Sequence, residues 1–204
     1  ALPFMASGGL GDVAGSLPAA LRKRLIGCRV VMPLYDSIPQ ELKDQMQFIT
    51  SISVPVAWRR QYCGIFEAKH NGVIYYLLDN QYYFKRDGIY GHYDDAERFA
   101  FFARAVLEII PAIDWKPDII HQHFGFDLAA MAEREGIPFV FTEHSSLHNR
   151  ALSPEKAEHL KRKYECCAAV LAVSRALAKN MRANTGVEAI VVPNSGDTAR
   201  IVPK

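Results

Sequence analysis

The second half of the chain alternates short apolar runs, rich in β-branched residues, with segments whose apolar residues recur at helical spacing. The apolar runs lie at residues 118–121, 138–142, 169–173 and 189–192. Runs this short, without a polar residue at every second position, are typical of strands that helices cover on both faces. The alternation therefore predicts an α/β fold with a doubly wound, mainly parallel sheet and helices on both faces.

The first half of the chain fits the same fold class. Strand-like runs lie at 28–33, 52–57, 62–68 and 73–78, and helical periodicity at 13–24 and 96–110. The sequence His70-Asn71-Gly72 predicts a hairpin turn between the last two strands. The chain has 204 residues, half of them hydrophobic, and no repeat, low-complexity tract or linker divides it. We therefore expect one Rossmann-like domain over residues 1–204.

A cluster of glycines near the start of the chain is the first candidate site. Gly8, Gly9 and Gly11 are followed at once by Asp12. Glycines let the backbone approach a ligand, and the helix expected after this loop would offer free N–H groups and a positive dipole. The loop is a candidate anion cradle, but the pattern is neither GxGxxG nor a P-loop, and a plain turn fits as well. Asp12, at the expected helix start, either complements the helix dipole or makes a polar contact with a ligand.

In doubly wound folds, a glycine loop that enters a helix normally follows a buried strand. Only Ala1–Ala6 precede this loop, and Pro3 interrupts even that segment. We therefore expect the chain to begin just after its natural first strand. An open position in the sheet would favour a dimer or strand exchange.

Composition argues against several classes of partner. The formal net charge is +2 and the basic residues form no long run, so nucleic acid is not expected. No apolar run reaches the roughly 18–20 residues that cross a bilayer, so no membrane is expected either. Four cysteines without metal-ligand spacing indicate a reduced, cytoplasmic protein, and we expect no metal and no cofactor.

Three histidines are the second candidate site. His121 and His123 lie at the carboxyl end of an expected strand, and His144 follows the next one, where α/β folds place ligands. Because side chains alternate along a strand, we expect His121 and His123 to point to opposite faces, which argues against a metal site made by this pair. A structural role for His144 fits nearly as well as a functional one.

Several separated motifs resemble a known family. The segments 7–18, 29–35, 86–91 and 94–105 resemble, in order, the opening of bacterial glycogen (starch) synthases, which are family 5 retaining glycosyltransferases. This resemblance covers residues 1–120. Residues 121–204, with Phe141-Thr-Glu-His-Ser-Ser and Ala172-Val-Ser-Arg-Ala-Leu, look like family 4 glycosyltransferases instead. Both families share the GT-B architecture, in which two Rossmann-like domains face each other across a cleft.

The resemblance implies a single N-terminal GT-B domain without its C-terminal nucleotide-sugar domain. A chain of two resemblances would be an engineered or recombined chimera, or an unusual natural hybrid, and we favour the engineered chimera. The implied activity is transfer of glucose from ADP-glucose to an α-1,4-glucan, with this domain on the acceptor side and inactive alone. The alternatives are a recombined scaffold without activity and a family 4 sugar transferase for a lipid or cell-surface acceptor.

The resemblance also assigns roles to residues. It makes Gly8, Gly9 and Gly11 a cleft loop, and it makes Tyr90 and Gly91 part of the cleft lining. His144 would contact the transferred sugar and, with Asp12, is the candidate for a catalytic role. His121 and His123 would contact substrate. The family carries a lysine for the donor phosphates where this chain has Ala6, so that contact would be lost.

Overall fold

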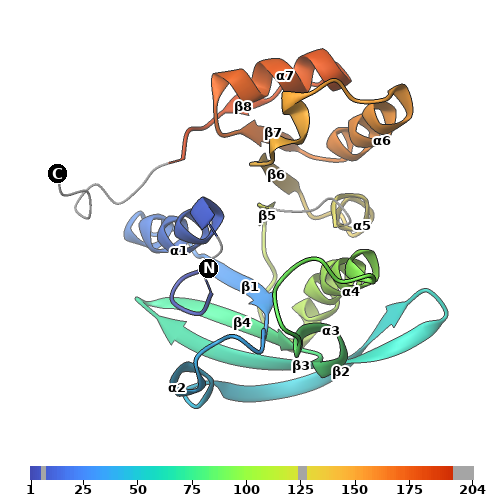
Figure 1. Ribbon diagram of the computed structural model, residues 1–204. Coiled ribbons are helices and arrows are strands. Elements are labelled where there is room, and N and C mark those ends of the chain that lie inside the picture. Colours follow the sequence, from blue (N-terminus) through green and yellow to red (C-terminus); the bar gives the residue numbers. More distant parts are fainter. Residues whose placement is uncertain (6–7, 124–127, 195–204) are drawn as a thin grey trace. The chain divides into compact units, whose positions relative to one another are not determined.

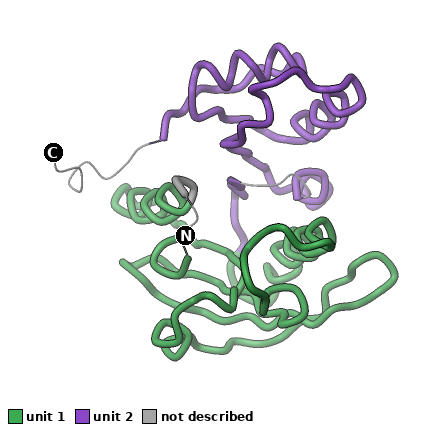
Figure 2. The backbone as a smooth tube through the Cα atoms, viewed as in Figure 1, with its two compact units in different colours: residues 1–115, 196–204 green, residues 116–195 purple. Residues whose placement is uncertain are grey.

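The computed structural model describes residues 1–5, 8–123 and 128–194. Residues 1–115 belong to one compact unit and residues 116–195 to a second (Figure 2). Each unit contains one four-stranded sheet, and the strand pairs of each sheet stay within one unit. The fold is the mixed α/β class that the alternation of strands and helices predicts.

The sheet of the first unit is mixed. Its strands are β1 (Arg29–Pro33), β2 (Gln47–Val56), β3 (Arg59–His70) and β4 (Val73–Asp79), in the order β1-β4-β3-β2. β1 runs parallel to β4, whereas β4, β3 and β2 are antiparallel. Asn71 and Gly72 have φ angles of 49° and 74°. These positive angles are those of a type I′ turn, which confirms the predicted hairpin.

The helices of the first unit include α1 (Gly8–Lys23), α2 (Gln40–Lys43), α3 (Gln81–Phe84), α4 (Asp95–Glu108) and the 3₁₀ turn η1 (Ile110–Ala112). α1 and α4 lie over one face of the sheet (Figure 1). α4 buries Arg98, Phe101 and Ala105 at the i, i+3, i+7 spacing of one helix face. The core that they join is rich in aromatic and aliphatic side chains from β3 and β4.

The second unit is the parallel part of the fold. Its strands are β5 (Ile120–Gln122), β6 (Phe139–Glu143), β7 (Ala169–Ala172) and β8 (Ile190–Val191), in that order and all parallel. Between them lie α5 (Ala129–Arg134), the 3₁₀ turn η2 (Ser146–Asn149), α6 (Pro154–Glu165) and α7 (Arg175–Thr185). All the strands and α-helices predicted for this half are found within a few residues of their expected places.

Local signals fix where these helices begin and end. The hydroxyl of Ser153 accepts a hydrogen bond from the Lys156 N–H at the start of α6, and Ser174 does the same for Leu177 at the start of α7. α7 ends at Thr185 and is capped by Gly186, whose φ of 75° is the left-handed conformation that glycine adopts without strain. Among the described residues no helix is long and apolar enough to cross a membrane.

The glycines near the start of the chain are placed differently from the prediction. Gly8, Gly9 and Gly11 lie within α1, which begins at Gly8, and not in a loop before the helix. Asp12 is therefore the fifth residue of the helix, and the prediction that it lies at the helix start is wrong. A helix interior tolerates each glycine at a cost of about 1 kcal/mol relative to alanine, and the remaining turns of α1, packed on the sheet, offset this. No strand precedes α1 among the described residues, and β1 lies at the edge of its sheet.

Candidate functional site

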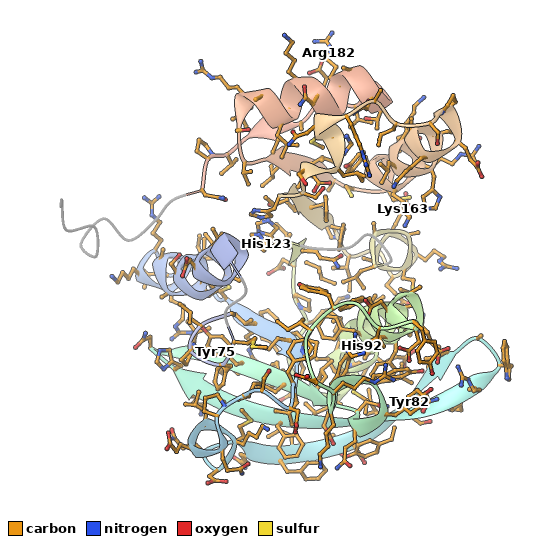
Figure 3. All side chains as sticks on the ribbon, viewed as in Figure 1. Tyr75, Tyr82, His92, His123, Lys163 and Arg182 are labelled. Carbon is orange, nitrogen blue, oxygen red and sulfur yellow. The ribbon has the colours of Figure 1, made fainter. Side chains whose placement is uncertain are left out.

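Three histidines of the second unit, His121, His123 and His144, form a cluster at the carboxyl ends of two neighbouring parallel strands. His121 lies in β5, His123 directly follows β5 and His144 directly follows β6. His123 Nδ1 lies 3.1 Å from His144 Nε2, and the ring centroids of His121 and His123 are 4.3 Å apart. The sticks in Figure 3 show nitrogen-bearing rings gathered where His123 is labelled. We call these residues the histidine cluster.

The expectation that His121 and His123 point to opposite faces is wrong, because their rings stack. Side chains two residues apart along a strand lie on the same face, so the strand alternation itself places His121 and His123 together, and the expectation misapplied it. His121 Nε2 lies 2.7 Å from Thr142 Oγ1 on β6, which holds its ring over the neighbouring strand. No group of three or more potential metal ligands is found among the residues that the structure describes.

Burial keeps the histidine cluster uncharged. Burial lowers the pKa of His123 to about 3, and the neighbouring His121 and His144 add to this effect. The side chain of His121 is exposed at the surface, and partial desolvation together with the neighbouring His144 lowers its pKa. Burial lowers the pKa of His144, and the nearby Glu143 carboxylate opposes this shift. A neutral imidazole carries one donor and one acceptor nitrogen. The cluster can therefore exchange hydrogen bonds with hydroxyl groups, but it brings no positive charge to a phosphate.

A buried carboxylate fixes the backbone on the far side of His144. Glu143 is only 4% exposed. One of its oxygens accepts a hydrogen bond from the Ser145 N–H at 2.8 Å and the other accepts one from the Tyr164 hydroxyl at 2.9 Å. The Tyr164 hydroxyl also lies 2.8 Å from His148 Nε2. Glu143 is thus occupied by structural hydrogen bonds on both sides, and the turn that carries His144 is held from two directions.

In the first unit, Tyr90 and Gly91 lie in the loop between α3 and α4. Tyr90 is 48% exposed and its ring centroid is 5.9 Å from that of Phe99. Gly91 has a φ of 93°, a conformation that favours glycine, and its N–H donates to Asp95 Oδ2 at 2.8 Å. The loop therefore presents an aromatic ring to solvent on a backbone that is fixed at its next residue.

The sequence did not point to Arg98, whose side chain hydrogen-bonds to this loop from the core of the unit. Its side chain is fully buried in the core of the unit. Arg98 Nε donates to the Tyr83 carbonyl at 2.8 Å, Nη1 donates to the Ile89 carbonyl at 3.3 Å, and the guanidinium pairs with Asp95. Because Ile89 precedes Tyr90, this arginine fixes the tyrosine from inside. The i, i+3, i+7 spacing of Arg98 with Phe101 and Ala105 is the signal that could have shown its burial.

The remaining candidates lie at the start of α1. Gly11 is buried and Asp12 is exposed. The helix dipole acts mainly within the first turn, so Asp12 in the second turn does not complement it strongly. Ala6, where the resemblance expects a lysine, lies outside the described residues. No glycine of α1 stands in a loop that could wrap a phosphate, so the anion cradle is the weakest of the candidates.

Comparisons with known proteins agree with this fold. The model of the starch synthase catalytic domain family matches residues 1–191. The glycogen synthase of Geobacillus thermodenitrificans (strain NG80-2) is 58% identical over 121 residues, which are 59% of this chain and 25% of that enzyme. The glycogen synthase of Clostridium botulinum (strain Alaska E43 / Type E3) is 60% identical over 119 residues, 58% of this chain and 25% of that enzyme. The matched part is thus about a quarter of the length of these curated relatives.

A solved structure shows the same fold. The catalytic domain of starch synthase IV from Arabidopsis thaliana, bound to ADP and acarbose, superposes with a TM-score of 0.79 at 20% sequence identity. The match covers 97% of this chain and 50% of that one. The family model extends well beyond residue 120, and the comparisons do not bear out the family 4 resemblance or the chimera, which stay predictions. The chain belongs to the starch synthase catalytic domain family.

Proposed function

We propose that this chain is the acceptor-side domain of a glycogen or starch synthase, a retaining transferase that moves glucose from ADP-glucose to an α-1,4-glucan. The observation that carries the proposal is the neutral histidine cluster at the carboxyl ends of β5 and β6, in a chain of this family. Uncharged imidazoles suit the hydroxyl groups of a sugar. The starch synthase IV relative with this fold was solved with ADP and acarbose, a nucleotide and a sugar analogue.

Within this proposal each candidate has a role. His144 contacts the transferred sugar, and His123 fixes its ring through the 3.1 Å contact between their nitrogens. Tyr90 stacks on a glucose unit of the acceptor, with Gly91 and Arg98 holding its loop. Asp12 makes an acceptor contact from the exposed side of α1. The backbone of Gly8 and Gly9 gives a ligand close access to the start of that helix, and Gly11, which is buried, supports this turn.

We further propose that the chain alone has no significant transferase activity. A family 5 enzyme holds most of the nucleotide sugar in its second domain, and the chain corresponds to half of the starch synthase IV structure. A cytoplasmic location fits the four cysteines, all of which are free thiols. Dimer formation or strand exchange at the open edge of β1 stays a prediction, which the mass of the protein in solution tests.

Calorimetric titration tests the proposed site. We expect saturable binding of maltohexaose or ADP-glucose that His144→Ala and Tyr90→Ala weaken. His159→Ala, which removes an exposed imidazole of α6, is the matched control and should bind like the unmodified chain. Binding that is unchanged in both site variants would refute the proposed site. Glucan elongation from ADP-glucose by the isolated chain would refute the proposed inactivity.

A further inference from the structure

A closed ring of hydrogen bonds in the second unit includes the turn that carries His144. Its side chains come from Glu143 at the end of β6, from His148 in η2 and from Tyr164 in α6. All three are buried, with exposed fractions of 4%, 2% and 2%. Buried polar side chains need hydrogen-bond partners, and here each of the three is a partner of another. The function proposed above gives His144 a role but leaves these three residues without one.

One half of the ring is formed at the backbone of the turn. Glu143 Oε1 accepts a hydrogen bond from the Ser145 N–H at 2.8 Å, and His144 lies between these two residues in the chain. The hydroxyl of Ser145 in turn accepts a hydrogen bond from the Leu147 N–H at 3.4 Å at the start of η2. The backbone on either side of His144 is therefore fixed by bonds that do not involve its imidazole.

The other half of the ring is formed by side chains. The Tyr164 hydroxyl oxygen lies 2.9 Å from Glu143 Oε2 and 2.8 Å from His148 Nε2. The path from Glu143 through Ser145, η2 and His148 thus returns to Glu143 by way of Tyr164. The turn cannot shift without breaking several of these bonds together, and bonds in such a network support one another.

α7 holds the end of η2 and the residues that follow it. Asn184 Nδ2 donates to the His148 carbonyl at 3.3 Å and to the Arg150 carbonyl at 3.1 Å. Asn184 Oδ1 accepts a hydrogen bond from the Leu152 N–H at 3.4 Å. The segment that follows His144 is therefore bonded to both α6 and α7 within one unit.

The order of the protons in the ring follows from the chemistry of its groups. The ionised carboxylate of Glu143 only accepts hydrogen bonds, so the single hydroxyl hydrogen of Tyr164 is donated to it. The Tyr164 oxygen is then the acceptor for His148 Nε2–H. His148 Nδ1 is the nitrogen without a hydrogen, and it has no hydrogen-bond partner among the residues that the structure describes. In this tautomer no N–H group of His148 is buried without an acceptor.

The position of the turn decides what His144 can offer a ligand. His144 Nε2 lies 3.1 Å from His123 Nδ1, so one of these two nitrogens carries the hydrogen that they share. This contact fixes the tautomer of His144, because the bond made by one imidazole nitrogen determines whether the other donates or accepts. A displacement of the turn by about 1 Å would take the contact out of hydrogen-bond range.

We propose that Glu143, His148 and Tyr164 are positioning residues for His144. Their ring of hydrogen bonds holds the His144 imidazole within reach of His123, and so fixes which of its nitrogens donates to a sugar hydroxyl and which accepts. The three residues act through the turn and do not touch the sugar. The contact of His144 with a sugar rests on the proposed function, whereas the positioning is a property of the chain without a ligand.

Nuclear magnetic resonance of the histidine ring nitrogens, measured on the unliganded chain at pH 7, tests the proposal. We expect His144 to adopt one tautomer in the unmodified chain and His148 to carry its hydrogen on Nε2. Tyr164→Phe opens the ring, so the single tautomer of His144 should be lost to a mixture. His144 in one tautomer in Tyr164→Phe, as in the unmodified chain, would overturn the positioning role.

Two further substitutions test the order of the protons. The glutamine of Glu143→Gln keeps an oxygen for the Ser145 N–H and turns its amide group toward Tyr164, so the phenol must donate to His148 instead. The hydrogen of His148 should therefore move from Nε2 to Nδ1 in this variant. His148→Gln, whose amide nitrogen replaces Nε2 as the donor to Tyr164, should keep the single tautomer of His144, and His148→Ala should lose it. A hydrogen on His148 Nδ1 in the unmodified chain would overturn the proton order.

A matched control separates position from stability. Ser174→Ala removes the cap of α7 in the same unit without touching the ring, so it should lower the stability and keep the single tautomer of His144. A mixture of tautomers in this control, or in the unmodified chain, would overturn the proposal. Calorimetry with maltohexaose is read separately. Absence of binding to the unmodified chain would count against the proposed function, while the tautomers would still decide the positioning role.

Discussion

Acid should destabilise the second unit well before its carboxylates become protonated. Burial, with His121 and His144 nearby, lowers the pKa of His123 to about 3, whereas a histidine in an unfolded chain has a pKa of about 6.5. The unfolded chain therefore binds more protons than the folded one between these two values. The stability that His123 contributes as a neutral ring is fully present above pH 6.5 and is lost as the pH falls toward 3.

The size of the effect follows from the two pKa values. Between pH 7 and pH 5, proton linkage at His123 alone lowers the free energy of unfolding by about 2 kcal/mol. The pKa values of His121 and His144 are shifted in the same direction, so they add to this loss. Aspartate and glutamate in an unfolded chain have pKa values of about 3.9 and 4.3. Most of the change above pH 5 therefore belongs to histidines.

Urea unfolding followed by circular dichroism at pH 7, 6 and 5 measures the effect. His123→Asn should remove about 2 kcal/mol of the pH dependence, because asparagine keeps a polar partner for His144 and does not titrate. His159→Asn, on the exposed face of α6, should keep the slope of the unmodified chain. Equal slopes for the unmodified chain and His123→Asn would refute the reasoning.

Three further substitutions test other parts of the structure. Tyr164→Phe should lower the free energy of unfolding by about 1–3 kcal/mol in urea, because it leaves Glu143 and His148 buried without the phenol; an unchanged midpoint would contradict this. Arg98→Met should lower the free energy of unfolding by at least about 3 kcal/mol, because the Ile89 carbonyl and Asp95 lose their partner. The same change should speed proteolysis within residues 85–93. A loop that stays protected from the protease would show that Arg98 does not hold it. Ser174→Ala should lower the free energy of unfolding by about 1 kcal/mol, because α7 loses its N-terminal cap. An unchanged midpoint of thermal unfolding would contradict this.

The parts of the fold that could be predicted from the sequence depend on local pattern. The runs around Ile120, Phe139 and Val170 are apolar and flanked by helical spacing, and each is a strand of the parallel sheet. The Asn71-Gly72 turn was predictable because few other dipeptides accept positive φ at two successive positions. In both cases a short stretch of sequence contains all the information that decides the structure.

The parts that could not be predicted depend on contacts between distant residues or on where an element ends. The contact between His123 and His144 follows from the pairing of β5 with β6, which no local pattern in the sequence shows. Gly8, Gly9 and Gly11 have low helix propensity and therefore favour a loop, but α1 includes all three of them. Its later turns, which pack on the sheet, stabilise the helix. Arg98 lies in the core although arginine is rarely buried without a partner, and its partners could not be identified from the sequence.

The separation of the strand ladders has a practical consequence for locating ligands. β1 to β4 form one hydrogen-bonded network and β5 to β8 another, among the described residues (Figure 1). Amide hydrogen exchange slows where a ligand stabilises the cooperative unit to which an amide belongs. A sugar at His144 should slow exchange in β6 and β7, whereas a glucose unit at Tyr90 should slow exchange in the unit that contains β1 to β4. One exchange experiment on the unmodified chain would thus assign each ligand to its ladder without any substitution.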